Sequence, residues 1–141
     1  MPAVHERIKA EVRERAGGQC EYCMLPSDQV LVPFEVEHIM PLQHGDTDAL
    51  GNLAYSCLHC NRHKGPNLSA IDRVTSKSRL IRLFNPRRHV WTYHFAFDGP
   101  RLRGLTPIGR VTVNLLQMNA HRMVALRMDL LEEDSDAKDS R

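Results

Sequence analysis

The fold of this chain is decided by residues 20–65, which read CEYCMLPSDQVLVPFEVEHIMPLQHGDTDALGNLAYSCLHCNRHKG. The segment begins with one Cys-x-x-Cys pair, Cys20 and Cys23, and closes with a second, Cys57 and Cys60, after a gap of 33 residues. Each pair can present two thiolates to one ion, and two such turns complete a tetrahedral site. All four cysteines of the 141-residue chain take part in this spacing, which predicts a structural zinc site.

Free or redox-active thiols are the alternative reading of these cysteines. A thioredoxin-like redox role needs only one such pair, at the start of a helix in a βαβ setting, and that pattern is absent here. Four thiolates leave the ion no open coordination position, so the expected zinc is structural rather than catalytic. The long gap between the pairs exceeds ordinary zinc-ribbon spacing and indicates an inserted functional element.

The inserted element has the pattern of a small hairpin followed by a helix. Residues 34–39 are apolar and β-branched enough for a strand, and residues 53–56 suit a short returning strand. Residues 40–52 are punctuated by proline, glycine and aspartate, which indicates a loop. A short helix is expected from Asn61 onward. The element is therefore of the α+β class.

Within this element the order of residues resembles the HNH endonuclease family. The matching parts are FEVEHIMPL at 34–42, GDTD at 45–48, Asn52-Leu53 and CLHCNRHKG at 57–65. The resemblance covers about residues 19–66. It implies a ββα-metal (His-Me finger) fold stapled by the four-cysteine zinc site, in a bacterial subgroup that carries a C-terminal extension.

The resemblance also implies roles for individual residues. His38 matches the general base, a role that suits histidine because its pKa as a residue type is near neutrality. Asn52 matches the asparagine that ties the loop to the strand and helps to orient the base. Glu37 and Asn61 match the ligands of a catalytic divalent cation, and His63, on the same short helix, is a second candidate that can replace or join Asn61.

The activity implied is hydrolysis of DNA phosphodiester bonds, with RNA as a possible substrate, using Mg²⁺, Mn²⁺ or a similar ion and leaving a 5′-phosphate and a 3′-hydroxyl. Two readings compete with this one. The first is a non-catalytic zinc-stabilised module that binds nucleic acid. The second is a structural or regulatory zinc protein that contacts other proteins.

The distribution of charge supports a nucleic-acid partner. Residues 1–61 hold four Lys and Arg against nine Asp and Glu, whereas residues 62–110 hold eleven against two. A basic segment is what a phosphate backbone selects, although a solvated basic face gives the same pattern. The expected nucleic-acid contacts are Arg62, Lys64, Arg79, Arg82, Arg87 and Arg88.

The remainder of the chain is expected to extend the same domain. Residues 89–97 alternate and predict a strand, paired through an Asp-Gly-Pro turn with residues 101–105. Thr106-Pro107 predicts a helix start, and a second helix is expected from about residue 119. We expect one nuclease domain over 1–131, with an extension from about residue 67, and a disordered acidic tail over 132–141.

The aromatic residues of the expected strand, Trp91, Tyr93 and Phe95, have two readings. They can form a stacking surface for nucleic acid, but they are more often the core of a hairpin. No stretch approaches the roughly 20 apolar residues of a membrane span, and the N-terminus lacks the pattern of a signal peptide. Cytoplasmic location and no membrane partner are the resulting expectations.

Overall fold

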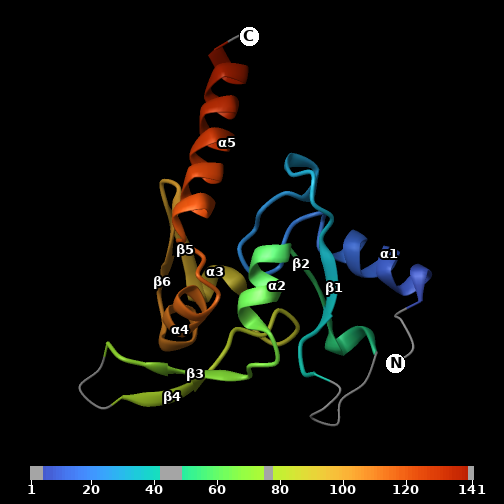
Figure 1. Ribbon diagram of the computed structural model, residues 1–141, viewed down its shortest axis with the longest axis vertical. Helices are drawn as coiled ribbons and strands as arrows, with labels where there is room; N and C mark the ends of the chain where they lie inside the picture. Colours follow the sequence, from blue (N-terminus) through green and yellow to red (C-terminus); the bar gives the residue numbers. More distant parts are fainter. Residues whose placement is uncertain (1–4, 42–48, 75–77, 140–141) are drawn as a thin grey trace.

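The computed structural model describes residues 5–41, 49–74 and 78–139, so the expected loop match at 45–48 lies outside the described residues. Figure 1 shows small antiparallel hairpins and short helices packed around α2, with the long helix α5 projecting from one end. The elements in chain order are α1 (Glu6–Arg15), β1 (Glu35–His38), β2 (Leu53–Ser56), α2 (Leu58–Lys64), β3 (Ser69–Asp72), β4 (Arg79–Arg82), α3 (Trp91–His94), β5 (Phe95–Asp98), β6 (Arg101–Gly104), α4 (Pro107–Leu115) and α5 (His121–Asp139). The expected α+β class is confirmed.

Strands β1 and β2 with helix α2 form the ββα unit (Figure 1). The strands are antiparallel, with Glu37 opposite Ala54 and His38 opposite Leu53. Helix α2 begins at Leu58, three residues before the expected start at Asn61. The reason is that the Cys57 sulfur accepts a hydrogen bond from the Cys60 backbone and caps the helix, so the second cysteine pair is itself the first helical turn.

The two faces of the β1–β2 hairpin are covered by different parts of the chain. Because side chains alternate along a strand, Leu53 and Tyr55 face one side, where they pack with Val12 of α1. Ala54 faces the other side and belongs to the core cluster that contains the cysteines. Glu37 shares the face of Ala54, so the hairpin directs this carboxylate toward the zinc knuckles.

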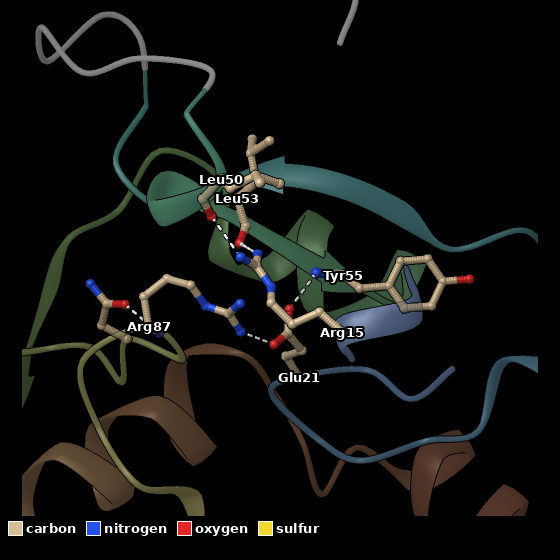
Figure 2. Close-up of polar contacts among 7 residues, drawn as sticks. Arg15, Glu21, Leu50, Leu53, Tyr55 and Arg87 are labelled. Atoms are coloured by element: carbon tan, nitrogen blue, oxygen red, sulfur yellow. Dashed lines mark hydrogen bonds and ion pairs between the residues drawn. The ribbon is translucent and has the colours of Figure 1, made fainter. Parts of the chain in front are cut away.

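A set of polar contacts joins α1, the first cysteine turn and the chain before α3 (Figure 2). Arg15 donates to the backbone oxygens of Leu50 and Leu53, at 3.0 and 2.7 Å. One carboxylate oxygen of Glu21 accepts the Tyr55 backbone N–H at 2.8 Å, and the other pairs with Arg87. Burial, and secondarily the charge of Arg15, lower the pKa of Arg87 to about 10. These contacts fix the first knuckle against β2.

The strand expected over residues 89–97 is wrong in its first half, because Trp91–His94 forms the helical turn α3 before β5 begins at Phe95. A helix brings residues i and i+4 to one side, and Trp91 stacks on Phe95 with ring centroids 5.2 Å apart. The Trp91 indole N–H also donates to the Tyr22 backbone oxygen at 2.8 Å. Two of the three aromatic residues therefore belong to the core, and only Tyr93 is exposed, at 70%.

The region 68–88, which has no assignment from sequence, contains the hairpin β3–β4 that projects from the body in Figure 1. Its inner face is held to α4 by an ion pair between Asp72 and Arg110 at 2.9 Å. Arg110 also lowers the pKa of Asp72 through this hydrogen bond. The ion pair therefore fixes the turn end of the hairpin, where Asp72 lies opposite Arg79, to α4.

Helix α4 begins as expected, with Thr106 as N-cap accepting the Gly109 N–H and Pro107 in the first turn. Gly109 lies so close to the His94 carbonyl oxygen that a Cβ there would collide with it. The disordered tail expected from residue 132 is wrong over most of its length, since α5 continues to Asp139. Its first turns are anchored by Arg127, which donates to the Pro100 and Met118 carbonyls. In the part of the chain described, no helix has the length and apolar character to cross a membrane.

Candidate active site and zinc centre

The four cysteines come together in the core. Their sulfur atoms all lie within 4.8 Å of one another, and all four residues are buried. The sulfurs of Cys23 and Cys57 are 3.8 Å apart. Four ligands at the usual Zn–S distance in a tetrahedron have sulfurs about 3.8 Å apart, so the spacing fits a single zinc ion. The donor set and the geometry agree with the structural site predicted from the spacing.

The crowded thiols perturb one another. Hydrogen bonds from neighbouring thiols, Cys20 foremost, lower the pKa of Cys57, whereas the pKa values of Cys23 and Cys60 are raised well above the ordinary range by the same group of sulfurs. The raised pKa values favour the protonated thiols at Cys23 and Cys60 when no cation is bound. A metal ion held by the four thiolates would displace these protons.

Glu37 is the most unusual carboxylate near the cluster, being only 7% exposed. Burial raises its pKa to about 7, against the lowering influence of the Lys64 ammonium. Its Oε1 is buried and has no hydrogen-bond partner within the described residues. The Tyr22 hydroxyl lies near enough to influence this pKa, yet it too is without a partner of ordinary hydrogen-bond geometry in that part of the chain. An orphaned buried carboxylate oxygen is a plausible donor for a hard cation.

His38 is the last residue of β1 and is half-buried. Strand alternation turns its side chain to the face opposite Glu37, although its charge is among the influences that lower the pKa of Glu37. The strand ends here because the next residues bend away, held by Ile39 donating its backbone N–H to the Asn52 carbonyl at 2.8 Å. His38 therefore lies at the loop end of the hairpin, where residues 39–52 connect β1 to β2.

Asn52 links the segment after β1 to the segment before β2 at this end of the hairpin. Its side-chain oxygen accepts the Met40 backbone N–H at 2.8 Å, and its side-chain nitrogen donates to the Met40 carbonyl at 2.9 Å. The Asn52 side chain thus adds two hydrogen bonds beyond the last residue pair of the two strands, close to His38. This geometry matches the loop-tying role that the resemblance implies for Asn52.

Replacing Asn52 with alanine is expected to lower the free energy of unfolding by about 1–3 kcal/mol, because two partly buried backbone groups of Met40 lose their partner. Urea unfolding followed by circular dichroism measures the change. The matched control is Asn114→Ala, at an exposed position of α4, which should change the stability by less than about 0.5 kcal/mol. Equal stability of the two variants would contradict the role of the Asn52 side chain.

The faces of α2 separate the two candidates for the second cation ligand. Lys64 faces β1, since its ammonium donates to the Ile39 carbonyl at 3.1 Å. Residues of a helix are about 100° apart, so Asn61 lies about 60° from Lys64 and His63 about 160° from Asn61. His63 instead contacts the preceding turn, with Nδ1 2.8 Å from the His59 carbonyl oxygen. The helix therefore favours Asn61 as the side chain nearer to Glu37.

Comparison with protein families gives a match in this part of the chain. Residues 20–67 match the family model for HNH endonuclease. This segment is an HNH element. The match covers 48 of the 141 residues, which is about a third of the chain. A search of curated proteins and a search of solved structures each gave no match.

The residues expected to contact nucleic acid divide into two groups around the HNH element. Arg62, Arg79, Arg82 and Arg88 are exposed. Lys64 is buried, with 2% exposure and a hydrogen bond to Ile39, and Arg87 is paired with Glu21. Both cations already have partners inside the protein, so the four exposed arginines are more accessible to a phosphate, and contacts by Lys64 and Arg87 stay predictions.

Tyr22 was not singled out from the sequence, and Lys64 was singled out only as a phosphate contact and not as a buried residue. Tyr22, between the first two cysteines, is fully buried, and burial followed by the charge of Glu37 raises its pKa well above the ordinary value. Lys64 lies four residues after Cys60, a spacing that puts it on the same helix face as a buried thiolate. That spacing was the available signal for its burial.

The second knuckle is also tied to the C-terminal helices. The Nε2 atom of His59 lies 2.7 Å from the Gln117 carbonyl oxygen, and its Nδ1 faces Arg122 at 3.3 Å. Burial lowers the pKa of His59. A neutral ring that donates from Nε2 to the carbonyl and accepts from the guanidinium at Nδ1 satisfies both contacts. His59 is thus a bridge between α2 and the turn before α5.

Proposed function

We propose that the chain is a metal-dependent endonuclease that hydrolyses DNA phosphodiester bonds. The observation that carries this proposal is the buried carboxylate of Glu37, which has an oxygen without a hydrogen-bond partner among the described residues and directly precedes His38 in a strand of the HNH element. A module that only binds nucleic acid has no need of an unpartnered charged group in its core, which is costly to keep. The same observation supports the fit of a hard cation at Glu37.

Each side chain has a distinct role in the proposed reaction. His38 takes a proton from the attacking water as its oxygen bonds to phosphorus. The bond from phosphorus to the 3′ oxygen breaks, and that oxygen takes a proton from solvent, leaving a 3′-hydroxyl and a 5′-phosphate. Asn52 holds the end of the hairpin so that the imidazole keeps its orientation. Loss of this orientation is expected to slow the reaction.

Glu37 and Asn61 would hold a divalent cation, Mg²⁺, Mn²⁺ or a similar ion. When bound, the cation supplies charge stabilisation at the phosphate and the leaving oxygen. The carboxylate is partly protonated near neutral pH because burial raises its pKa to about 7. Lys64 opposes this effect, which keeps the carboxylate anionic in a larger share of molecules.

The four cysteines would hold a structural zinc ion, and the thiolates suit a reducing compartment such as the cytoplasm. We take residues 1–131 as one nuclease domain, with its motif core at about 19–66. Support for a single unit comes from contacts across its length, since Glu21 pairs with Arg87 and His59 contacts Gln117. RNA remains an alternative substrate for the same chemistry.

The test is nicking of supercoiled plasmid by the zinc-loaded protein, with and without added Mg²⁺ or Mn²⁺. Nicks should appear only with the cation, and DNA ligase should seal them, because ligase needs a 5′-phosphate beside a 3′-hydroxyl. DNA binding without nicking under every cation would instead favour the non-catalytic module. Absence of binding to any DNA or RNA at low salt would favour a zinc protein that contacts other proteins.

The choice of cation ligand is tested in the same assay. Asn61→Ala is expected to raise the Mn²⁺ concentration for half-maximal nicking by about 10- to 100-fold. His63→Ala, the matched change on the same helix, should shift it by less than about threefold, since His63 lies on another face. The opposite ranking would assign the ligand to His63.

A further inference from the structure

A pocket of about 310 Å³, lined by both apolar and polar side chains, opens beside the end of the β1–β2 hairpin. One wall contains Ile39 and Asn52, which lie just beyond His38 at the loop end of the hairpin. The other wall contains Arg82, Asn85 and Arg88. We infer that this pocket is a phosphate subsite that holds the nucleic-acid backbone next to the scissile phosphate. The inference rests on the proposed function and adds to it the part of the substrate that this surface binds.

Among the described residues, the charges around the pocket are of one sign. The residues of this part of the chain that line it include the cations Lys64, Arg82 and Arg88 and no carboxylate. The Lys64 ammonium is already bound to the Ile39 carbonyl. The positive potential that faces the pocket therefore comes mainly from the two arginines, and an anion is the ligand that such a potential attracts.

Arg82 and Arg88 differ from the arginines that hold the fold together. Arg15, Arg87, Arg110 and Arg127 each donate to a carboxylate or to backbone carbonyls. Within the described ranges, the guanidinium group of neither Arg82 nor Arg88 has a hydrogen bond or an ion pair. Both nevertheless lie near the same imidazole, since each helps to lower the pKa of His89, after the larger effect of burial.

Two unpartnered guanidinium groups near one point are unfavourable without an anion, because like charges repel. Guanidinium binds phosphate through paired N–H donors, and a single phosphate group can engage both arginines. Neither residue needs to read a base for this purpose. The pocket is consequently expected to strengthen binding equally for DNA of different sequences.

The position of the pocket links it to the proposed chemistry. Ile39 immediately follows His38, and Asn52 holds the same end of the hairpin through Met40. The opposite wall is supplied by β4 and by the residues after it, outside the HNH match at 20–67. The C-terminal extension thus completes a cleft whose first wall belongs to the catalytic hairpin.

The test measures binding of a fluorescein-labelled 20-base-pair DNA duplex by anisotropy, without added divalent cation, between 50 and 200 mM KCl. The variants are Arg82→Ala, Arg88→Ala and the double variant, each with its zinc retained. The control is Arg103→Ala, an exposed arginine on β6 that does not line the pocket. Each phosphate contact contributes about 0.9 to the slope of log K against log salt.

The double variant is expected to bind at least about 10-fold more weakly at 100 mM KCl. The magnitude of its salt slope should fall by the amount that corresponds to the loss of about one to two phosphate contacts. In nicking assays its KM should rise while kcat stays within about twofold, because uniform binding is lost. Arg103→Ala should leave both slope and KM unchanged. Arg82→Lys with Arg88→Lys should retain most of the slope, since lysine keeps the charge.

An unchanged salt slope in the double alanine variant would overturn the subsite, and metal-dependent nicking by the wild type would then leave the proposed function intact. A reduced slope in a protein that never nicks DNA would support the subsite and overturn the proposed function. If the Arg82→Ala, Arg88→Ala and double alanine variants unfold at the melting temperature of the wild type, their weaker binding is not caused by a loss of the fold. A fall in slope for Arg103→Ala equal to that of the double variant would also overturn the subsite.

Discussion

Cys57→Ser is expected to abolish cooperative folding of the protein at 25 °C. The residue is one of four buried sulfurs that lie within 4.8 Å of one another. Zinc binding contributes about 10–16 kcal/mol in zinc-finger peptides, which is comparable to the whole stability of an ordinary domain, about 5–15 kcal/mol. Serine can still cap α2 as the cysteine does, so the loss reports the metal site rather than the helix start.

Two measurements check this expectation: zinc content by mass spectrometry and thermal unfolding by circular dichroism. The wild type should hold one zinc per chain, and a strong zinc chelator should reproduce the effect of the substitution. Arg62→Ala, at an exposed position of the same helix, should keep both the zinc and the melting temperature. If Cys57→Ser retained its zinc and unfolded cooperatively, the four-cysteine site would not be required for the stability of the fold.

His38→Ala is expected to lower the rate of metal-dependent nicking by about 10²- to 10⁴-fold, the usual contribution of a general base. DNA affinity should remain within about threefold, because the imidazole acts on the water and not on the phosphate backbone. The fold should survive, since His38 is half-buried at the end of β1 rather than in the core. Plasmid nicking under single-turnover conditions measures the chemical step.

His121→Ala is the matched control for this experiment, because His121 is exposed at the start of α5. It should nick DNA at the wild-type rate. If His38→Ala were equally active, the base would have to be another group, although the zinc site and the HNH match would remain. Full loss of nicking together with loss of DNA binding would point to a structural effect and not to catalysis.

The local features of this protein were available in the sequence because each depends on residues close together in the chain. The spacing of the cysteines predicted the zinc cluster, the alternating residues after Phe34 predicted β1, and Thr106-Pro107 predicted the start of α4. The motif from residue 34 to residue 65 also predicted the family that the comparison found. Short-range hydrogen bonding and ligand spacing are sufficient for such predictions.

Two predictions of local structure from the sequence were wrong. The aromatic alternation over 89–97 suited a strand, but the stacking of Trp91 on Phe95 and the hydrogen bond from Trp91 to Tyr22 made the first part a helical turn. The acidic composition after residue 131 suggested disorder, yet α5 continues there. In the first case propensity was outweighed by neighbours in space. The second case has no such cause, since residues 132–136 are exposed and simply continue the helix that begins at His121.

The sequence by itself determined the thiol cluster and the ββα order, and it proposed His38, Glu37 and Asn52 as candidate site residues, since all lie in one short motif. Only the tertiary structure decided which cations are available to a substrate. Lys64 and Arg87 are used to neutralise buried groups, whereas Arg82 and Arg88 face a pocket. Charge is visible in a sequence, but whether that charge is already satisfied depends on partners as many as 66 residues away.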